Sequence, residues 1–150
     1  MTWEYIAGFF DGEGSLTHNG KGFRITIPQT NEESLNSIRD FVKAGFVIHI
    51  TKRKAHWKES WTYYIASQKD VYAFLMQIKK FVIVKKANVL AVLPELKYNI
   101  EQQRLRQDKS LKRHAQAVAL REKGLSYWRI GLEMGGLDRG YIRRIILRRY

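Results

Sequence analysis

Residues 2–14 read TWEYIAGFFDGEG, and this stretch predicts a short helix from Thr2 to Asp11. Thr2 is suited to cap the first turn, and Glu4 lies where the positive end of the helix dipole favours an acid. The glycines that follow Asp11 are expected to stop the helix. Glu13 would then follow the stop, held at a fixed place with its carboxylate oxygens free.

The predicted helix has no polar side. Apolar side chains and glycine cover nearly every face between Trp3 and Phe10, which is typical of a helix that is buried on two sides. One side can face its own domain. Ala7 and Gly8 would leave another side smooth enough for a close approach, so the pattern indicates a partner helix.

The chain is strongly basic. It has 150 residues, of which 45% are apolar, and a formal net charge of +13. Such a charge on a short chain indicates a polyanionic partner, and the absence of a long amphipathic helix favours nucleic acid over an anionic membrane. Residues 1–96 carry 13 Lys and Arg against 9 Asp and Glu, whereas residues 97–150 carry 14 against 5. The C-terminal third is therefore expected to be a second, more basic unit.

The composition excludes several classes of protein. There is no cysteine, which excludes disulfides and cysteine-rich zinc modules. The four histidines show no metal-ligand spacing. No apolar run reaches the length of a membrane span, and the opening segment does not resemble a secretion signal. We expect an intracellular protein, either in the cytoplasm of a prokaryote or phage-infected cell or in an organelle.

Alternating segments follow the first helix. Apolar and polar residues alternate near residues 23–27, 46–51 and 60–65, which predicts strands there, with residues 18–22 as the turn before the first of them. Helical spacing predicts helices at 31–42, 69–79 and 84–108, the last of them bent or interrupted near Pro94. The expected order is α-β-β-α-β-β-α, an α+β fold with a four-stranded antiparallel sheet and helices on one face.

Each strand is expected to turn an apolar face to the helices and a polar face outward, with Phe46, Ile48 and Ile50 facing inward. A polar sheet face can enter a major groove and read base edges. It can also be only the solvated face of an antiparallel sheet, but the net charge favours DNA. The residues expected to contact DNA on this face and in the basic loop 52–58 are Arg24, Thr26, His49, Thr51, Arg53, Lys54, Lys58, Ser60, Thr62 and Tyr64.

Residues 6–14, IAGFFDGEG, followed by Ser15, resemble the signature motif of the LAGLIDADG homing endonucleases. The order of helices and strands is also similar to that family, and the resemblance covers residues 2–105. It implies an endonuclease that cuts both strands of a long DNA target with Mg²⁺, for which Mn²⁺ can substitute.

The resemblance implies that Glu13 is the metal-binding acid, a position where the family usually has Asp, and that Gly12 lies beside it at the metal. Carboxylate oxygens suit hard divalent cations, and Mg²⁺ keeps several waters and binds phosphate oxygens alongside them. Asp11 matches the earlier acid of the motif and is expected to have a structural role in ending the helix.

Two further catalytic positions are implied by the resemblance. Gln29 is similar to the polar residue that positions active-site water, and Asn31 is its rival if the register differs. Lys85 is similar to the family's basic residue near the scissile phosphate, and Lys86 is its rival.

In this family a single motif copy implies a homodimer. Residues 130–136, IGLEMGG, look like a second copy, but no second set of strands follows them. The resemblance therefore implies a homodimer through the helix Trp3–Asp11 and a roughly palindromic DNA target.

Residues 109–150 are predicted to form a unit distinct from an endonuclease core at residues 1–108. Short helices expected at 114–123 and 127–134 and after Asp138 resemble a helix-turn-helix DNA-binding unit. In that interpretation the third helix enters the major groove, with Arg139 and Arg143 as base-reading candidates and Arg144 as a further DNA contact. The alternative is a basic extension that packs on the core or holds phosphates without reading bases.

The leading hypothesis is an intron- or intein-type homing endonuclease. An RNA-splicing maturase and a non-catalytic DNA-binding regulator are the alternatives. The presence of Glu13, Gln29 and Lys85 together favours cleavage.

Overall fold

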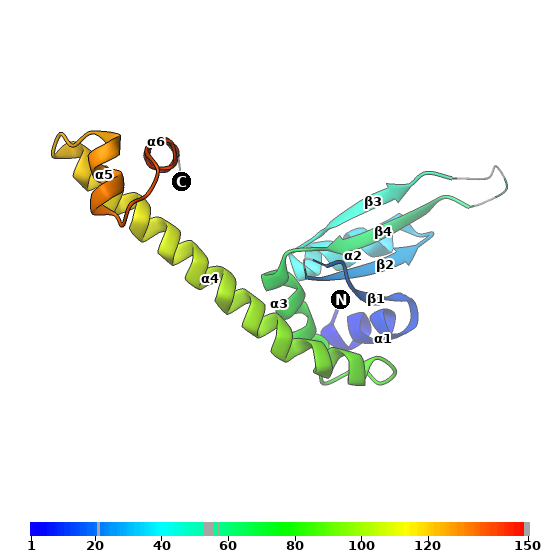
Figure 1. Ribbon diagram of the computed structural model, residues 1–150. Helices are drawn as coiled ribbons and strands as arrows, with labels where there is room; N and C mark the ends of the chain where they lie inside the picture. The colour runs from blue at the N-terminus through cyan, green and yellow to red at the C-terminus, as the bar shows by residue number, and fades with distance from the viewer. Residues whose placement is uncertain (21, 53–55, 57, 149–150) are drawn as a thin grey trace. The chain divides into compact units, whose positions relative to one another are not determined.

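The computed structural model describes residues 1–20, 22–52, 56 and 58–148. The chain divides into two compact units, residues 1–101 and residues 102–150, whose elements are labelled in Figure 1. The boundary expected between residues 108 and 109 lies inside a helix of the second unit.

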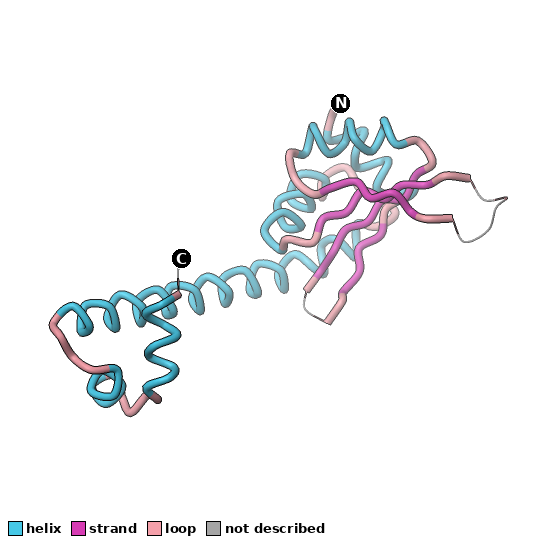
Figure 2. Tube along the Cα trace, turned by 90° about the horizontal axis from the view of Figure 1, so that it is seen from above, coloured by secondary structure: helices cyan, strands magenta, loops and turns pink. Residues whose placement is uncertain are grey.

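The first unit is built on an antiparallel sheet of four strands with the order β1-β2-β4-β3. Figure 2 shows these strands side by side in magenta. The observed elements follow the predicted α+β order. In chain order they are α1 (Trp3–Glu13), β1 (Ser15–His18), β2 (Phe23–Gln29), α2 (Glu32–Val42), β3 (Phe46–Ile50), β4 (Ser60–Ile65), α3 (Gln68–Ile78) and α4 (Lys86–Glu122), which continues into the second unit.

One face of the sheet carries the core of this unit. Ile25 and Ile27 of β2 and Tyr63 and Ile65 of β4 are buried, whereas their neighbours along each strand remain partly or fully exposed. Helices α1, α2 and α3 cover this face (Figure 1) and contribute their own buried side chains to the same cluster. The inward and outward alternation predicted for β2 and β4 is confirmed.

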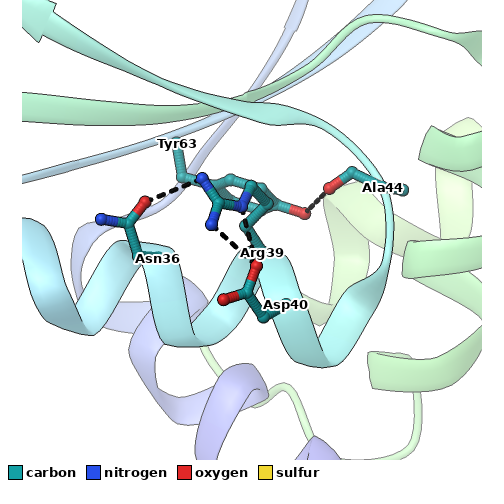
Figure 3. Close-up of polar contacts among 5 residues, drawn as sticks. All are labelled: Asn36, Arg39, Asp40, Ala44 and Tyr63. Atoms are coloured by element: carbon teal, nitrogen blue, oxygen red, sulfur yellow. Dashed lines mark hydrogen bonds and ion pairs between the residues drawn. The ribbon is translucent and has the colours of Figure 1, made fainter.

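Polar contacts lie within α2 and between β4 and the segment before β3 (Figure 3). The Tyr63 hydroxyl donates to the carbonyl of Ala44 at 2.7 Å, just before β3 begins. Burial raises the pKa of Tyr63, with a smaller contribution from the charge of Asp70, so the hydroxyl stays neutral and remains a donor. On α2, the Arg39 guanidinium donates to the side chains of Asn36 and Asp40, each at 2.9 Å.

The orientation predicted for β3 is wrong. Phe46, Ile48 and Ile50 are 49%, 40% and 44% exposed and lie on the open face of the sheet. Val47 packs against the core instead, directly across from the buried Tyr63. Because residues that face each other across a ladder share one side of the sheet, Tyr63 fixes the phase of β3.

The long helix α4 also differs from the prediction. It is not interrupted at Pro94 and runs on to Glu122, so the separate helix expected at 114–123 is its last part. Leu93 and Leu96 are buried on either side of Pro94. Their burial holds the helix against the core and offsets the hydrogen bond that proline cannot donate.

The second unit is a small helical cluster. After α4 come α5 (Tyr127–Glu133) and α6 (Arg139–Leu147). Ala117, Ile130 and Ile142, one from each helix, form its buried centre. None of the helices in the described part of the chain combines the length and hydropathy that crossing a bilayer requires.

Candidate active site

Glu13 is the last residue of α1, which passes through Gly12 and has Gly14 as its C-cap. The predicted stop at Asp11 is wrong, because one glycine weakens a helix but does not end one whose neighbours are held in the core. The Gly14 N–H donates to the Phe10 carbonyl at 2.9 Å, and a Cβ atom at Gly14 would lie 2.2 Å from the Phe10 ring. The chain turns into β1 directly after Glu13 because residue 14 has no side chain.

The Glu13 side chain is exposed, and within the described residues no hydrogen bond or ion pair engages its carboxylate. It lines a surface hollow of about 490 Å³ together with Gly12 and with Gln29 from the end of β2. The β1–β2 hairpin explains this proximity. Since Ser15 pairs with Thr26, the end of β2 returns to the end of α1.

Gln29 is oriented by its neighbour. Its Oε1 atom accepts a hydrogen bond from the Thr30 backbone N–H at 2.8 Å. Asn31, the alternative candidate, is used elsewhere, because its Oδ1 atom accepts from the Ser34 N–H at 2.8 Å and caps α2. Of the two candidates, Gln29 is the one in the hollow with Glu13.

Asp11 does not end α1 as expected but binds the segment that leads into α4. Its carboxylate accepts hydrogen bonds from the backbone N–H groups of Ile83, of Val84 at 3.2 Å and of Lys85 at 3.0 Å. The Lys85 ammonium donates to the Asp11 carbonyl. Desolvation raises the pKa of the Asp11 carboxyl, but the hydrogen bonds from Ile83, Lys85 and Val84 and the Lys85 charge outweigh it and lower the pKa. These contacts hold Lys85 beside Asp11 in the last turn of α1, and Asp11 precedes Glu13 by two positions in the sequence.

An exposed stripe runs along the outer face of α1. Tyr5, Gly8, Phe9 and Gly12 follow helical spacing and line the hollow that holds Glu13. The Tyr5 and Phe9 rings stack with their centroids 5.9 Å apart. Ala7, which was expected on a smooth outer side, is fully buried, and Gly12 takes that place beside Gly8. The i, i+4 glycine spacing on this face was the signal that the sequence reasoning missed.

The open face of the sheet carries part of the predicted DNA-contacting set. Arg24, Thr26, Ser60, Thr62 and Tyr64 alternate with the buried residues of β2 and β4 and lie on this face. The Arg24 Nε atom donates to the Thr17 hydroxyl at 3.0 Å. Lys58 is exposed in the segment before β4, and Arg53 and Lys54 lie outside the described residues.

His49 does not belong to this face. It lies across from Trp61 on the side of Val47, and its ring contacts the Glu59 carboxylate at 2.5 Å. Glu59 also binds the Lys52 ammonium at 2.6 Å, and hydrogen bonds from Lys52 and His49 lower its pKa. The prediction for His49 is wrong for the same reason as that for β3. Thr51 lies beyond the last residue pair of the ladder.

The predicted DNA-contacting arginines of the second unit lie on α6, whose first turn is capped by the Asp138 carboxylate through the N–H groups of Gly140 and Tyr141. Arg139 and Arg143 are exposed and one helical turn apart. Arg144 lines a groove against α4 that neither of them lines, and it shares a second hollow with Arg143.

Metal-ligating side chains do not cluster within one copy of the chain. Across the described residues, no three Asp, Glu or His side chains come together where they could hold a metal ion. At the hollow, one copy offers the carboxylates of Glu4 and Glu13, which are too few to form such a cluster.

Comparisons with known proteins agree with this fold. The structure resembles the homing endonuclease I-CvuI in complex with a DNA target, at 17% identity and a TM-score of 0.52, over 96% of this chain and 91% of that one. It also resembles the archaeal intron-encoded homing endonuclease I-Vdi141I complexed with DNA, at 19% identity and a TM-score of 0.51, over 96% of this chain and 93% of that one.

A third similar structure is the LAGLIDADG meganuclease I-AabMI bound to uncleaved DNA. Here the identity is 19% and the TM-score 0.55, over 78% of this chain and 44% of that one. At these identities the likeness shows the fold alone. No curated protein sequence matches the chain significantly.

A family model decides the membership. The model of the LAGLIDADG-like domain matches residues 2–79, which include α1, the whole sheet and α2. This match extends over more than half of the 150 residues. The chain belongs to the LAGLIDADG-like domain family.

Proposed function

We propose that this protein is a site-specific homing endonuclease of the intron or intein type. In this proposal it acts as a homodimer and makes double-strand breaks in a long, roughly palindromic DNA target with a divalent metal. One observation carries it: Glu13, with no partner among the described residues, ends a helix whose outer face is an exposed stripe of glycine and aromatic side chains. Membership of the LAGLIDADG-like domain family supports the same function.

The stripe on α1 supports a two-fold helix contact. Gly8 and Gly12 have no side chains, so the backbone of a second α1 can approach closely there. Tyr5 is 52% exposed in one copy, and its burial beside Phe9 would stabilise the contact. In a two-fold dimer the same face is used by both copies. The two Glu13 residues would then lie near the axis.

The residues at the hollow fit a hard divalent cation such as Mg²⁺. Glu13 would hold the ion through its carboxylate oxygens, and the carbonyl of Gly12 is a second oxygen donor beside it. Bound Mg²⁺ supplies charge stabilisation to the oxygens of the scissile phosphate and activates water. Gln29 would orient that water through its amide N–H groups, since its oxygen is already engaged by Thr30.

The open face of the sheet is the surface we assign to the DNA major groove. It presents hydroxyl and guanidinium groups on β2 and β4 and apolar side chains on β3. Hydroxyl and guanidinium groups read base edges, and apolar side chains suit thymine methyl groups. Arg139 and Arg143 of α6 would add base contacts of their own, as in a helix-turn-helix unit.

A plasmid cleavage assay tests the proposal. The substrate carries the uninterrupted insertion site of the gene that harbours the coding sequence, and the reaction contains Mg²⁺ or Mn²⁺. We expect linear product from the wild-type protein and neither nicked nor linear product from Glu13→Gln, with DNA binding retained. Glu95→Gln, an exposed glutamate on α4, is the matched control and should cleave as the wild type does.

Two other outcomes would reject the nuclease, and a third would reject the shared site. Binding of duplex DNA without cleavage by either metal would favour a DNA-binding regulator. Tight binding of the intron transcript without DNA cleavage would favour a maturase. Nicking without linear product would contradict a site shared by two copies.

A further inference from the structure

A basic groove lies within the second unit, between α4 and α6. It encloses about 550 Å³, and its lining includes Arg106, Lys109 and Arg113 from α4, Tyr141 and Arg144 from α6, and Arg148 directly after α6. Ser110 and Ile145 also line it, and none of its described lining residues carries a carboxylate. We call this feature the α4–α6 groove.

The spacing of the cations produces two facing rows. Arg106, Lys109 and Arg113 stand at i, i+3 and i+7, which places them on one side of α4. Arg144 lies on α6, and Arg148 is the C-cap residue that follows this helix. On α4 the row extends over about 10 Å at 1.5 Å per residue, and this length spans two or three successive phosphates of a strand.

Four of the cations that line the groove are uncompensated within the described part of the chain, where no carboxylate pairs with Arg106, Lys109, Arg113 or Arg144. Arg144 lies over the Tyr141 ring at 6.0 Å, which orients the guanidinium without neutralising it. Like charges gathered in a concave surface raise the local concentration of anions. A polyanion that enters such a groove releases its condensed counterions.

Arg139 and Arg143 are not among the described residues that line the groove. Successive helical residues are rotated by about 100°, so Arg144 lies on another side of α6 than Arg139. Arg143 lies between these two sides, because it lines a second hollow with Arg144 and Arg148. A helix-turn-helix unit explains Arg139 and Arg143 but gives no role to the cations turned to α4.

We propose that the α4–α6 groove binds one sugar–phosphate strand of a nucleic acid. The two rows of cations would hold successive phosphates, and Tyr141 would pack against a sugar or base. Arg144 is then a phosphate contact rather than a base-reading residue. A membrane surface fits less well, because the groove is concave and its described lining has only Ile145 and Tyr141 as apolar or aromatic residues. The proposal does not depend on cleavage.

The test is equilibrium binding of the full chain to labelled duplex DNA, single-stranded DNA and single-stranded RNA of one arbitrary sequence. All proteins carry Glu13→Gln and the buffer lacks divalent metal, so failure of the nuclease proposal does not affect the result. The groove variant is Arg106→Gln with Lys109→Gln and Arg113→Gln. The matched control is Lys97→Gln with Lys112→Gln and Lys123→Gln, which removes the same charge from exposed positions outside the groove.

The groove variant should bind at least one of the three probes about tenfold more weakly than the control near 0.1 M salt. Its slope of log K against log salt should fall by about 2 to 3 relative to the wild type. The probe with the largest loss identifies duplex or single strand as the ligand. Equal affinities and equal slopes for the two variants on every probe would overturn the proposal. Circular dichroism checks folding, and Arg144→Gln alone serves as a milder second variant.

Discussion

Asp11 and Lys85 are joined by two hydrogen bonds, each between the side chain of one residue and the backbone of the other. The Asp11 carboxylate accepts from the Lys85 backbone N–H at 3.0 Å, and the Lys85 ammonium donates to the Asp11 carbonyl. These residues are 74 positions apart in sequence. The pair joins the last turn of α1 to the start of α4. The end of α1 that carries Glu13 is therefore fixed by a segment that is distant in sequence.

Replacing Asp11 by Asn should lower the free energy of unfolding at neutral pH by about 1–3 kcal/mol, because hydrogen bonds to a charged acceptor are lost. The Asp11 pKa is lowered in the folded chain, so its contribution to stability is fully present above the unfolded pKa near 3.9 and is lost as the pH falls through the folded pKa. Urea unfolding should therefore give a large difference in the free energy of unfolding between wild type and Asp11→Asn at pH 7. This difference should shrink at acidic pH.

Asp108→Asn is the control for this prediction. Asp108 is exposed and lies 3.9 Å from Arg104, a geometry that contributes at most about 1 kcal/mol. Equal losses for the two variants, or a difference at Asp11 that does not depend on pH, would contradict the role assigned to Asp11.

Much of the first unit could be predicted because its sequence alternates clearly. In β2, Arg24 and Thr26 interrupt three apolar residues, so one face is unambiguous. β3 reads Phe-Val-Ile-His-Ile, which offers an apolar residue to either face. Only the partner strand decides between them, and the pairing of Val47 with Tyr63 is a long-range fact that local periodicity does not contain.

The candidate site, like the first unit, could be predicted from the sequence only in part. Glu13 and Gln29 were both implied by the family resemblance, and the β1–β2 hairpin brings them to one hollow. The position of Gly12 rather than Ala7 on the outer face of α1 could not be predicted. A helix that is apolar on all sides does not show from its sequence which side faces outward. The link from Asp11 to residues 83–85 was also invisible, because it depends on how the end of α3 returns to α1.

Gly8→Leu should disrupt the proposed dimer while the single chain stays folded. A Cβ atom at Gly8 meets nothing within 4 Å in one copy, and replacing a helical glycine favours the helix by about 0.5–1 kcal/mol. Sedimentation should shift from dimer to monomer, with an unchanged or higher stability of the monomer. Ala91→Leu, at an exposed position of α4, should leave the dimer intact. A Gly8→Leu protein that still sediments as a dimer would remove α1 from the interface.

Paired threonine substitutions test the orientation of β3. Val47→Thr places a hydroxyl against the core and should lower the free energy of unfolding by about 1–3 kcal/mol. Ile48→Thr, at a side chain that is 40% exposed, should lower it by less than about 1 kcal/mol. Chemical denaturation measures both. A larger loss of stability for Ile48→Thr than for Val47→Thr would support the orientation in which Ile48 faces the core.

The same strand tests the DNA surface. Ile48→Lys adds a cation to the open face and should tighten binding to duplex DNA, with the salt slope growing by about 1. His49→Lys adds the same charge on the opposite side, next to Glu59, and should change the slope much less. Fluorescence anisotropy over a salt series measures both variants. If His49→Lys gave the larger effect, DNA would have to bind elsewhere than the open face.

Lys85 and Lys86 can be separated by replacing each with Met. Lys85→Met removes the charge and the hydrogen bond at the last turn of α1 and should lower stability by about 1 kcal/mol. If Lys85 also acts near the scissile phosphate, the rate of single-turnover cleavage at saturating protein should fall far more than the affinity for DNA. Cleavage is measured well below the unfolding temperature of the variant. Lys86 is the exposed first residue of α4, and Lys86→Met should leave stability and cleavage unchanged. Loss of cleavage in Lys86→Met with normal cleavage in Lys85→Met would transfer the role to Lys86 and leave Lys85 with a structural one.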